Sequence, residues 1–324
     1  MSSSYSKPYL PVDQQIALME SRGMTFGDKG RARRYLETIG YYNLSGYSYP
    51  MRRYGGSGRS DDFVSGATFE HVLDLYHFDK VLRRLTIEAL ERLEQAVKVD
   101  LALRLGAADT FAHLHERHFD RSFVTPVRSG STRPGVPPPK SHAIWVEEHA
   151  KKLNRNNSDF INHFRRNYGA DLPIWVAIEV MDFNDVSWLV KGARQTYRIQ
   201  MAQRFGVPDD GRLKSWVQTM RYLRNVCAHH GRLWNRSFDV QPRQVSDEED
   251  PFFAGLNAQP SSWGRTYGAL TILAHLNQVV APDSKWALRV ARHISTFPSG
   301  PNIQLGAMGV QPNWRSDPPW QITP

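Results

Sequence analysis

The stretch RNVCAHHGRLWNR, residues 224–236, gathers side chains that are suited to chemistry on a phosphate. A histidine can take up or give a proton near neutral pH. An arginine can hold a phosphate and stabilise the negative charge that develops on it. Because RNA supplies its own nucleophile, the 2′-OH, a histidine and an arginine beside a scissile phosphate would suffice without a metal. The expected products are a 2′,3′-cyclic phosphate and a 5′-OH.

Other side chains of this stretch are expected to hold RNA. Cations can grip neighbouring phosphates, and an indole can stack on a base. The expected RNA-binding residues are Arg221, Arg232, Trp234, Asn235 and Arg236. Each has a plainer interpretation: an arginine and a histidine on a helix usually form a solvated face, and a tryptophan such as Trp234 more often fills a gap in the core.

A helix over residues 212–229, which Asp209 or Asp210 can cap, must position the first half of the stretch. Its apolar stripe is Trp216, Val217, Met220, Leu223 and Cys227, at helical spacing. The opposite face carries Arg221, Asn225 and His229. Arg224 and His229 lie roughly 140° apart on a regular helix. They therefore converge only if the helix ends or distorts near Ala228, with Gly231 as the expected C′ residue, or if two chains meet there.

Metal, nucleotide and serine-hydrolase chemistry have little support. Cys227 is the single cysteine, and no CxxC or HExxH pattern accompanies His229 and His230, which point apart as adjacent residues. His113, His115 and His118 would form at best a partial zinc site, and we expect them to be surface histidines. No GxxxxGK[ST] or GxSxG motif is present. We expect no metal and no cofactor.

The composition indicates a globular protein with polyanionic partners. The formal net charge is +9, with 40% hydrophobic and 11% aromatic residues, which favours nucleic acid as a partner. One cysteine permits no intrachain disulfide, so we expect the reducing cytoplasm. The N-terminus does not look like a signal peptide, and no apolar window reaches the ~20 residues of a membrane span.

The periodicities predict an all-α fold. Apolar residues recur every three or four positions over residues 68–105, which predicts one long helix. A short helix is expected to open at Val12-Asp13-Gln14-Gln15, with Asp13 as its N-cap. Further short helices are expected at 29–39, 143–153, 158–166, 185–191, 198–205, 263–276 and 284–295, and one should start at Leu172-Pro173. Residues 40–50, with four tyrosines, suit a turn. For these tyrosines, packing between the N-terminal wing and the long helix is favoured over stacking on RNA bases. Residues 55–66 and 127–141 read as loops.

Five ordered motifs resemble one known family, the bacterial abortive-infection proteins of the AbiD/AbiF type, called the Abi family. They are Gln15 through Arg22-Gly23 with YYNLSGY (41–47), YHFDKVLR (76–83), LPIWV (172–176), RNVCAHHGRLWNR (224–236), and the tryptophans near 309–320. The resemblance runs nearly end to end. It departs at Asn184, where the family pattern leads one to expect glycine.

The resemblance implies a fold and a site. Abi proteins are similar to the HEPN superfamily of helical bundles, often dimers, with an R-x4-6-H ribonuclease motif. The sequence shows no clean linker, so we expect one cooperative unit with an N-terminal helical wing (1–66), and the resemblance implies that residues 67–324 form a HEPN-like helical domain. The implied catalytic residues are Arg224 and His229, with Asn225 as a polar positioner and His230 as a substitute. A homodimer, and restraint by a small RNA or protein antitoxin, fit such a toxin.

Two functions follow from these observations. The first is a metal-independent endoribonuclease of phage defence that acts on RNA in the cytoplasm. The second is a non-catalytic RNA-binding or phage-sensing module, in which Arg224, Arg232 and Arg236 only hold phosphates. They differ at His229, because catalysis needs its proton whereas binding does not.

Overall fold

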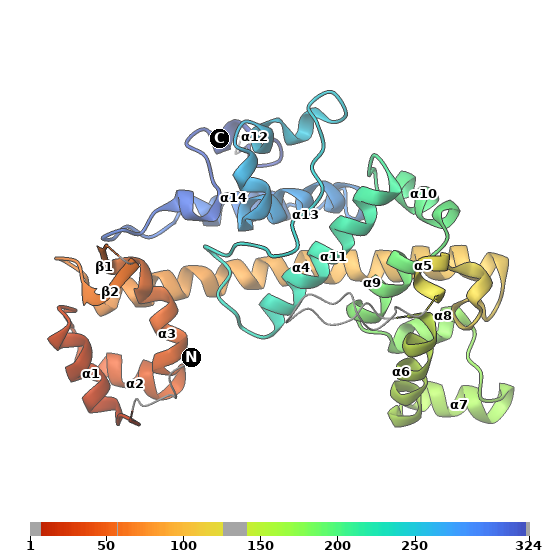
Figure 1. The fold of residues 1–324 in the computed structure, drawn as a ribbon, viewed down its shortest axis with the longest axis horizontal. Coiled ribbons are helices and arrows are strands. Elements are labelled where there is room, and N and C mark those ends of the chain that lie inside the picture. Colours follow the sequence, from red (N-terminus) through yellow and green to blue (C-terminus); the bar gives the residue numbers. More distant parts are fainter. Residues whose placement is uncertain (1–7, 57, 126–140, 322–324) are drawn as a thin grey trace.

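The computed structural model describes residues 8–56, 58–125 and 141–321, and this part of the chain is mostly helical. Helix α4 (Phe69–Ala108) is the axis of the molecule, and the other elements are arranged along it (Figure 1). Thr68 caps α4 by accepting a hydrogen bond from His71 N. Apolar residues at three- and four-residue spacing are buried along its length, as its sequence predicts.

The N-terminal wing lies at the beginning of α4 (Figure 1). It contains α1 (Val12–Ser21), α2 (Lys29–Thr38), α3 (Tyr41–Ser48) and an antiparallel hairpin of β1 (Arg52–Gly55) and β2 (Gly58–Phe63). Two predictions are wrong here, since residues 41–48 form a helix and not a turn, and the hairpin occupies part of the expected loop. Pro11, not Asp13, is the N-cap residue of α1.

Short helices cover the other end of α4 (Figure 1). They are α5 (Arg121–Val124), α6 (His142–Arg155), α7 (Asp159–Tyr168), α8 (Ile174–Ala177), α9 (Phe183–Gly192) and α10 (Gln195–Arg204). Gly106 does not end α4. A Cβ atom there would lie 3.2 Å from the ring of Trp175 and 3.3 Å from Ile174, so glycine allows the LPIW segment to pack closely.

Helices α11 (Asp210–Ala228), α13 (Thr266–Val280) and α14 (Trp286–Ile294) contact the middle of α4, and the short α12 (Ala254–Asn257) precedes α13. Asp209 caps α11 by accepting from Arg212 N, which confirms the predicted start. Trp216, Trp263, Trp286 and Trp320 are buried in this part of the core. Most of the loop expected at 127–141 lies outside the described residues.

Candidate active site at the end of α11

Helix α11 ends in a tight turn formed by the two histidines. His229 is the C-cap residue. His230 N donates to Cys227 O (3.2 Å) and Gly231 N donates to Val226 O (2.8 Å), the pair of bonds that defines a Schellman motif. His230, with φ = 56°, is the left-handed residue, so the prediction that Gly231 holds this place is wrong. A left-handed residue other than glycine is strained by about 1–2 kcal/mol.

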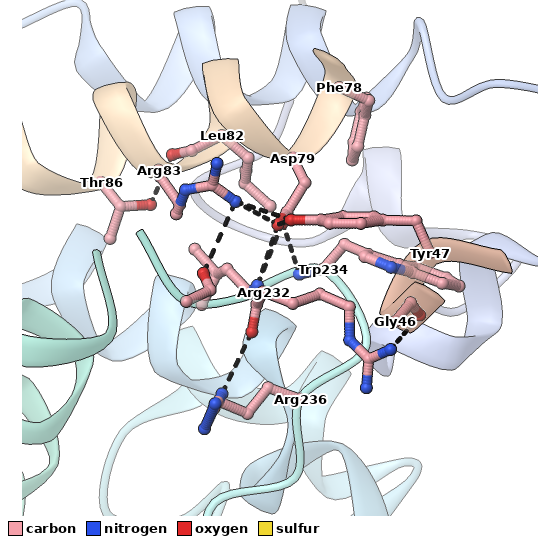
Figure 2. A network of polar contacts seen from close by, with 12 residues as sticks. Gly46, Tyr47, Phe78, Asp79, Leu82, Arg83, Thr86, Arg232, Trp234 and Arg236 are labelled. Atoms are coloured by element: carbon pink, nitrogen blue, oxygen red, sulfur yellow. Dashed lines mark hydrogen bonds and ion pairs between the residues drawn. The ribbon is translucent and has the colours of Figure 1, made fainter. Parts of the chain in front are cut away.

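A buried carboxylate fixes the backbone that follows this turn (Figure 2). Asp79 on α4 accepts hydrogen bonds from Leu233 N (3.0 Å) and Trp234 N (2.6 Å), and also from Tyr47 Oη (2.7 Å) and Arg83 Nη1 (2.5 Å). Burial and the adjacent Asp79 carboxylate raise the pKa of Tyr47, which keeps this phenol protonated. Residues from three sequence motifs therefore meet at one carboxylate.

The arginines after the turn are partly used for structure (Figure 2). Arg232 donates to Gly46 O, and its burial lowers its pKa. Arg236 donates to Arg232 O (3.1 Å) and Tyr222 Oη (2.8 Å). Trp234 is 1% exposed and packs against Phe297. Its position is that of a core residue, so the structure favours the packing interpretation of Trp234 over base stacking.

Two hollows flank the turn. The α4–α11 pocket, of about 840 Å³, is lined by Tyr76, Lys80, Arg83, Arg84, Ile87, Glu91, Glu94, Gln95, Arg224, Cys227, Ala228 and His230. The α3–α11 groove, of about 1000 Å³, contains Tyr42, Tyr49, Arg52, His229, His230, Arg232, Asn235 and Arg236 among its lining residues. His230 thus lines both hollows. Arg224 and His230 share the pocket, whereas His229 faces the groove.

The α4–α11 pocket is rich in charge. Arg224 lies 3.6 Å from Glu94, measured from Nε to Oε2, and remains about one third exposed. Lys80 and Arg84 add positive charge from α4. Cys227 is a poor nucleophile here, because burial raises its thiol pKa to about 12. The sequence did not single out Lys80 and Arg84 as site residues. Their i, i+4 spacing places them on one face of α4, but it cannot show that α11 packs against that face.

A polar stripe runs along α11 toward the turn. It consists of Lys214, Gln218, Arg221, Asn225 and His229, which fall within about 80° on a regular helix. All five are at least partly exposed.

The stripe leads to a second cluster of cations that the sequence did not reveal. Lys191, Lys214 and Arg243 line the α9–α11 pocket, of about 560 Å³. Burial, Arg221 and Lys214 together lower the pKa of Lys191, as expected where cations gather. Sequence alone could not bring these residues together, because they come from separate segments.

Asn184, which stands where the family pattern leads one to expect glycine, forms a hydrogen bond with a residue of the polar stripe. Its Oδ1 accepts a hydrogen bond from Arg221 Nη1 at 2.6 Å. Burial lowers the pKa of Arg221. The asparagine therefore ties α9 to α11 and orients an expected RNA-binding residue.

The histidines between α4 and α5 lie away from this site. His115 is exposed, but His113 and His118 are buried. The expectation that all three are surface residues is therefore wrong for two of them, because the segment after α4 turns back onto α6, α9 and α10.

In the part of the chain that the structure describes, no helix is long and apolar enough to cross a membrane.

Comparisons with known proteins identify the family of this chain. No curated protein and no solved structure matches the chain. Residues 34–235, which include α4, α11 and the turn with both histidines, match the family described as Abi-like protein. The chain therefore belongs to the Abi-like protein family, which is linked to abortive infection in phage defence.

Proposed function

We propose that this protein is a metal-independent endoribonuclease of phage defence with a HEPN-like fold. The observation that carries the proposal is the pairing of Arg224 and His230 in one charged pocket at the end of α11. An exposed imidazole beside a partly exposed guanidinium is the minimum set for cleavage of RNA by its own 2′-OH. The Abi-like family supplies the setting, because RNA cleavage would stop growth of an infected cell.

The roles follow from the positions. The scissile phosphate sits at the junction of the α4–α11 pocket and the α3–α11 groove, beside His230. The 2′-oxygen attacks phosphorus, and the bond from phosphorus to the 5′-oxygen breaks. Arg224 stabilises the charge on the phosphoryl oxygens, with Lys80 and Arg84 nearby. His230 and His229 transfer the two protons, one from the 2′-OH and one to the 5′-oxygen.

The surroundings supply a track for the strand. On one side, the α3–α11 groove presents Arg232 and Arg236 together with the tyrosines Tyr42 and Tyr49. On the other, the polar stripe of α11 leads to Lys191, Lys214 and Arg243. A row of cations interrupted by aromatic rings suits a single-stranded polyanion. Restraint by a small RNA or protein antitoxin, and action as a homodimer in the cytoplasm, belong to the same proposal.

Cleavage in the presence of EDTA tests the function. Purified wild-type protein should cut single-stranded RNA and leave 2′,3′-cyclic phosphate and 5′-OH ends. Arg224→Ala should lose about 10²–10³-fold in rate, as removal of one charge-stabilising donor does. The readout is gel-resolved cleavage with end-group analysis of the products.

The matched control is Arg292→Ala, which removes an exposed arginine from α14 and should cut at the wild-type rate. Equal cutting by wild type and Arg224→Ala would point to a contaminant or to another site. RNA that is bound but left intact by the wild type would favour the second candidate, a non-catalytic RNA-binding module built on the α3–α11 groove.

Tyr42 should serve as a stacking platform for RNA. Its side chain is 92% exposed and lines the α3–α11 groove, unlike Tyr47, which is buried. Tyr42→Ala should weaken RNA binding by about 1–3 kcal/mol, the usual contribution of one stacked base, whereas Tyr42→Phe should bind nearly as the wild type does. Fluorescence anisotropy with labelled RNA measures both, and an equal loss in the two variants would exclude stacking.

A further inference from the structure

A second cluster of chemically active side chains lies at the far end of α4. Asp109 is the C-cap residue of α4. His115 lies between two short 3₁₀ segments, Ala112–Leu114 and Glu116–His118, and His118 is the last residue of the second. Arg224 contacts α4 at Glu94. Fifteen residues of helix separate Glu94 from Asp109, which is about 22 Å. The cluster is therefore separate from the proposed ribonuclease site.

Three ligand atoms converge in this cluster. Asp109 Oδ2 lies 2.6 Å from His115 Nδ1 and 3.2 Å from His118 Nε2, and all three atoms lie within 4.8 Å of one another. Ligands bound to a metal at about 2.0–2.2 Å in tetrahedral geometry stand roughly 3.3–3.6 Å apart. The donors therefore need to move little to surround an ion.

The groups behind the ligands hold them in orientation. His118 Nδ1 lies 3.0 Å from Tyr197 Oη, and Asp109 Oδ1 accepts from Phe111 N at 2.9 Å. Such outer contacts accompany the ligands of protein metal sites and fix the imidazole tautomer. His118 Nε2 also lies 3.2 Å from Arg117 Nε, so the ring nitrogen that faces Asp109 is the one in contact with the arginine.

The Arg117 guanidinium occupies the position that a metal ion would take between these ligand atoms. Its guanidinium donates both to Asp109 Oδ2 and to His118 Nε2, yet its side chain is 65% exposed. The ligands behind it are well covered, since Asp109 and His118 have side chains only 10% and 9% exposed. An exposed arginine can swing into solvent, which would free the two ligand atoms and leave open positions for water.

We propose that Asp109, His115 and His118 form a binding site for a divalent transition-metal ion, with Zn²⁺ the best fit, and that Arg117 is the cation it displaces. Two imidazoles and one carboxylate suit Zn²⁺ and its neighbours, whereas Mg²⁺ and Ca²⁺ favour oxygen ligands. A bound ion would clamp the end of α4 to the segment before α5. This site does not take part in the proposed RNA cleavage, so it stands whether or not that function does.

A second histidine cluster lacks this geometry. His113, His142 and His149 are buried beside Trp145, and His113 and His149 contact each other edge to face at 5.7 Å between ring centroids. His142 Nε2 is already bonded to His113 O, and the His149 ring stacks on Trp145. This second cluster is better explained as packing, and it does not carry the inference.

Zinc titration of tag-free, EDTA-stripped and desalted protein tests the site. Isothermal titration with ZnCl₂ at pH 7.5 should show one equivalent bound to the wild type, and MgCl₂ should show none. His115→Ala, which changes an exposed side chain, should bind Zn²⁺ at least about tenfold more weakly. His163→Ala, an exposed histidine on α7, is the matched control and should bind as the wild type does.

Arg117→Gln separates a metal site from a simple ion-pair network. If Arg117 competes with the ion, Arg117→Gln should bind Zn²⁺ several-fold more tightly, and Zn²⁺ should raise its thermal midpoint more than that of the wild type. The proposal is overturned if His115→Ala binds Zn²⁺ as well as the wild type does. It is equally overturned if Arg117→Gln binds no more tightly, because the guanidinium would then not occupy the ion's place.

Discussion

Asp79→Ala is expected to lower the free energy of unfolding by about 3–5 kcal/mol, the range seen when one partner of a buried charge pair is removed. Asp79 is fully buried and accepts hydrogen bonds from Arg83, Tyr47 and the backbone N–H groups of Leu233 and Trp234. Alanine would leave the buried Arg83 cation and both N–H groups without this acceptor. Urea or guanidinium unfolding, followed by circular dichroism, measures the loss.

Two further variants make this expectation specific. Asp74→Ala removes an exposed carboxylate from the same helix and should change stability by less than about 0.5 kcal/mol. The double variant Asp79→Ala/Arg83→Met should recover part of the loss, because it removes the stranded cation as well. A loss below 1 kcal/mol in Asp79→Ala would show that the loop after α11 does not depend on this carboxylate.

His230→Ala is expected to slow RNA cleavage by about 10²–10⁴-fold, the usual contribution of general acid–base catalysis. His230 shares the α4–α11 pocket with Arg224, whereas His229 lines only the α3–α11 groove. His229→Ala should therefore have the smaller effect within a single chain. Single-turnover cleavage in EDTA compares the two variants, with His163→Ala as the histidine control.

The alternatives have distinct signatures. A larger loss in His229→Ala would indicate that Arg224 of one chain meets His229 of a second chain, and mixing the inactive Arg224→Ala and His229→Ala proteins should then restore some cleavage. Wild-type rates in both histidine variants would exclude proton transfer by this turn.

His230→Gly separates chemistry from folding. Glycine adopts φ = 56° without strain, so this variant should be more stable than the wild type by about 1 kcal/mol and yet cleave as slowly as His230→Ala. A protein that is more stable but inactive cannot owe its inactivity to unfolding. Retained activity in His230→Gly would remove the imidazole from the mechanism.

Helices whose information is local could be predicted from the sequence. The apolar spacing over residues 68–105 predicted α4, because one buried helix face requires apolar residues every three or four positions. Asp209 or Asp210 marked the start of α11 in the same way, since a carboxylate cap satisfies N–H groups only a few residues away.

The wing shows where such local signals fail. Helix α3 contains glycine and five of its eight residues are tyrosine or serine, so its own propensity is weak. Leu44 and Tyr47 are buried against α4, and this packing stabilises the helix. Strand β2 is largely polar, so it carries no alternating apolar pattern.

For the candidate site too, the sequence predicted some features and the tertiary structure decided others. The residue types of 224–236 predicted chemistry on a phosphate, and the 100° step of a helix correctly separated the directions of Arg224 and His229. The sequence alone therefore determined the helical class, the main helices, the family motifs and the types of side chain present at the end of α11. The tertiary structure decided that Arg224 shares a pocket with His230, that Asp79 holds a loop more than 150 residues away, and that Asp109 meets two histidines. These contacts depend on which faces of distant elements pack together, and no local pattern encodes that choice.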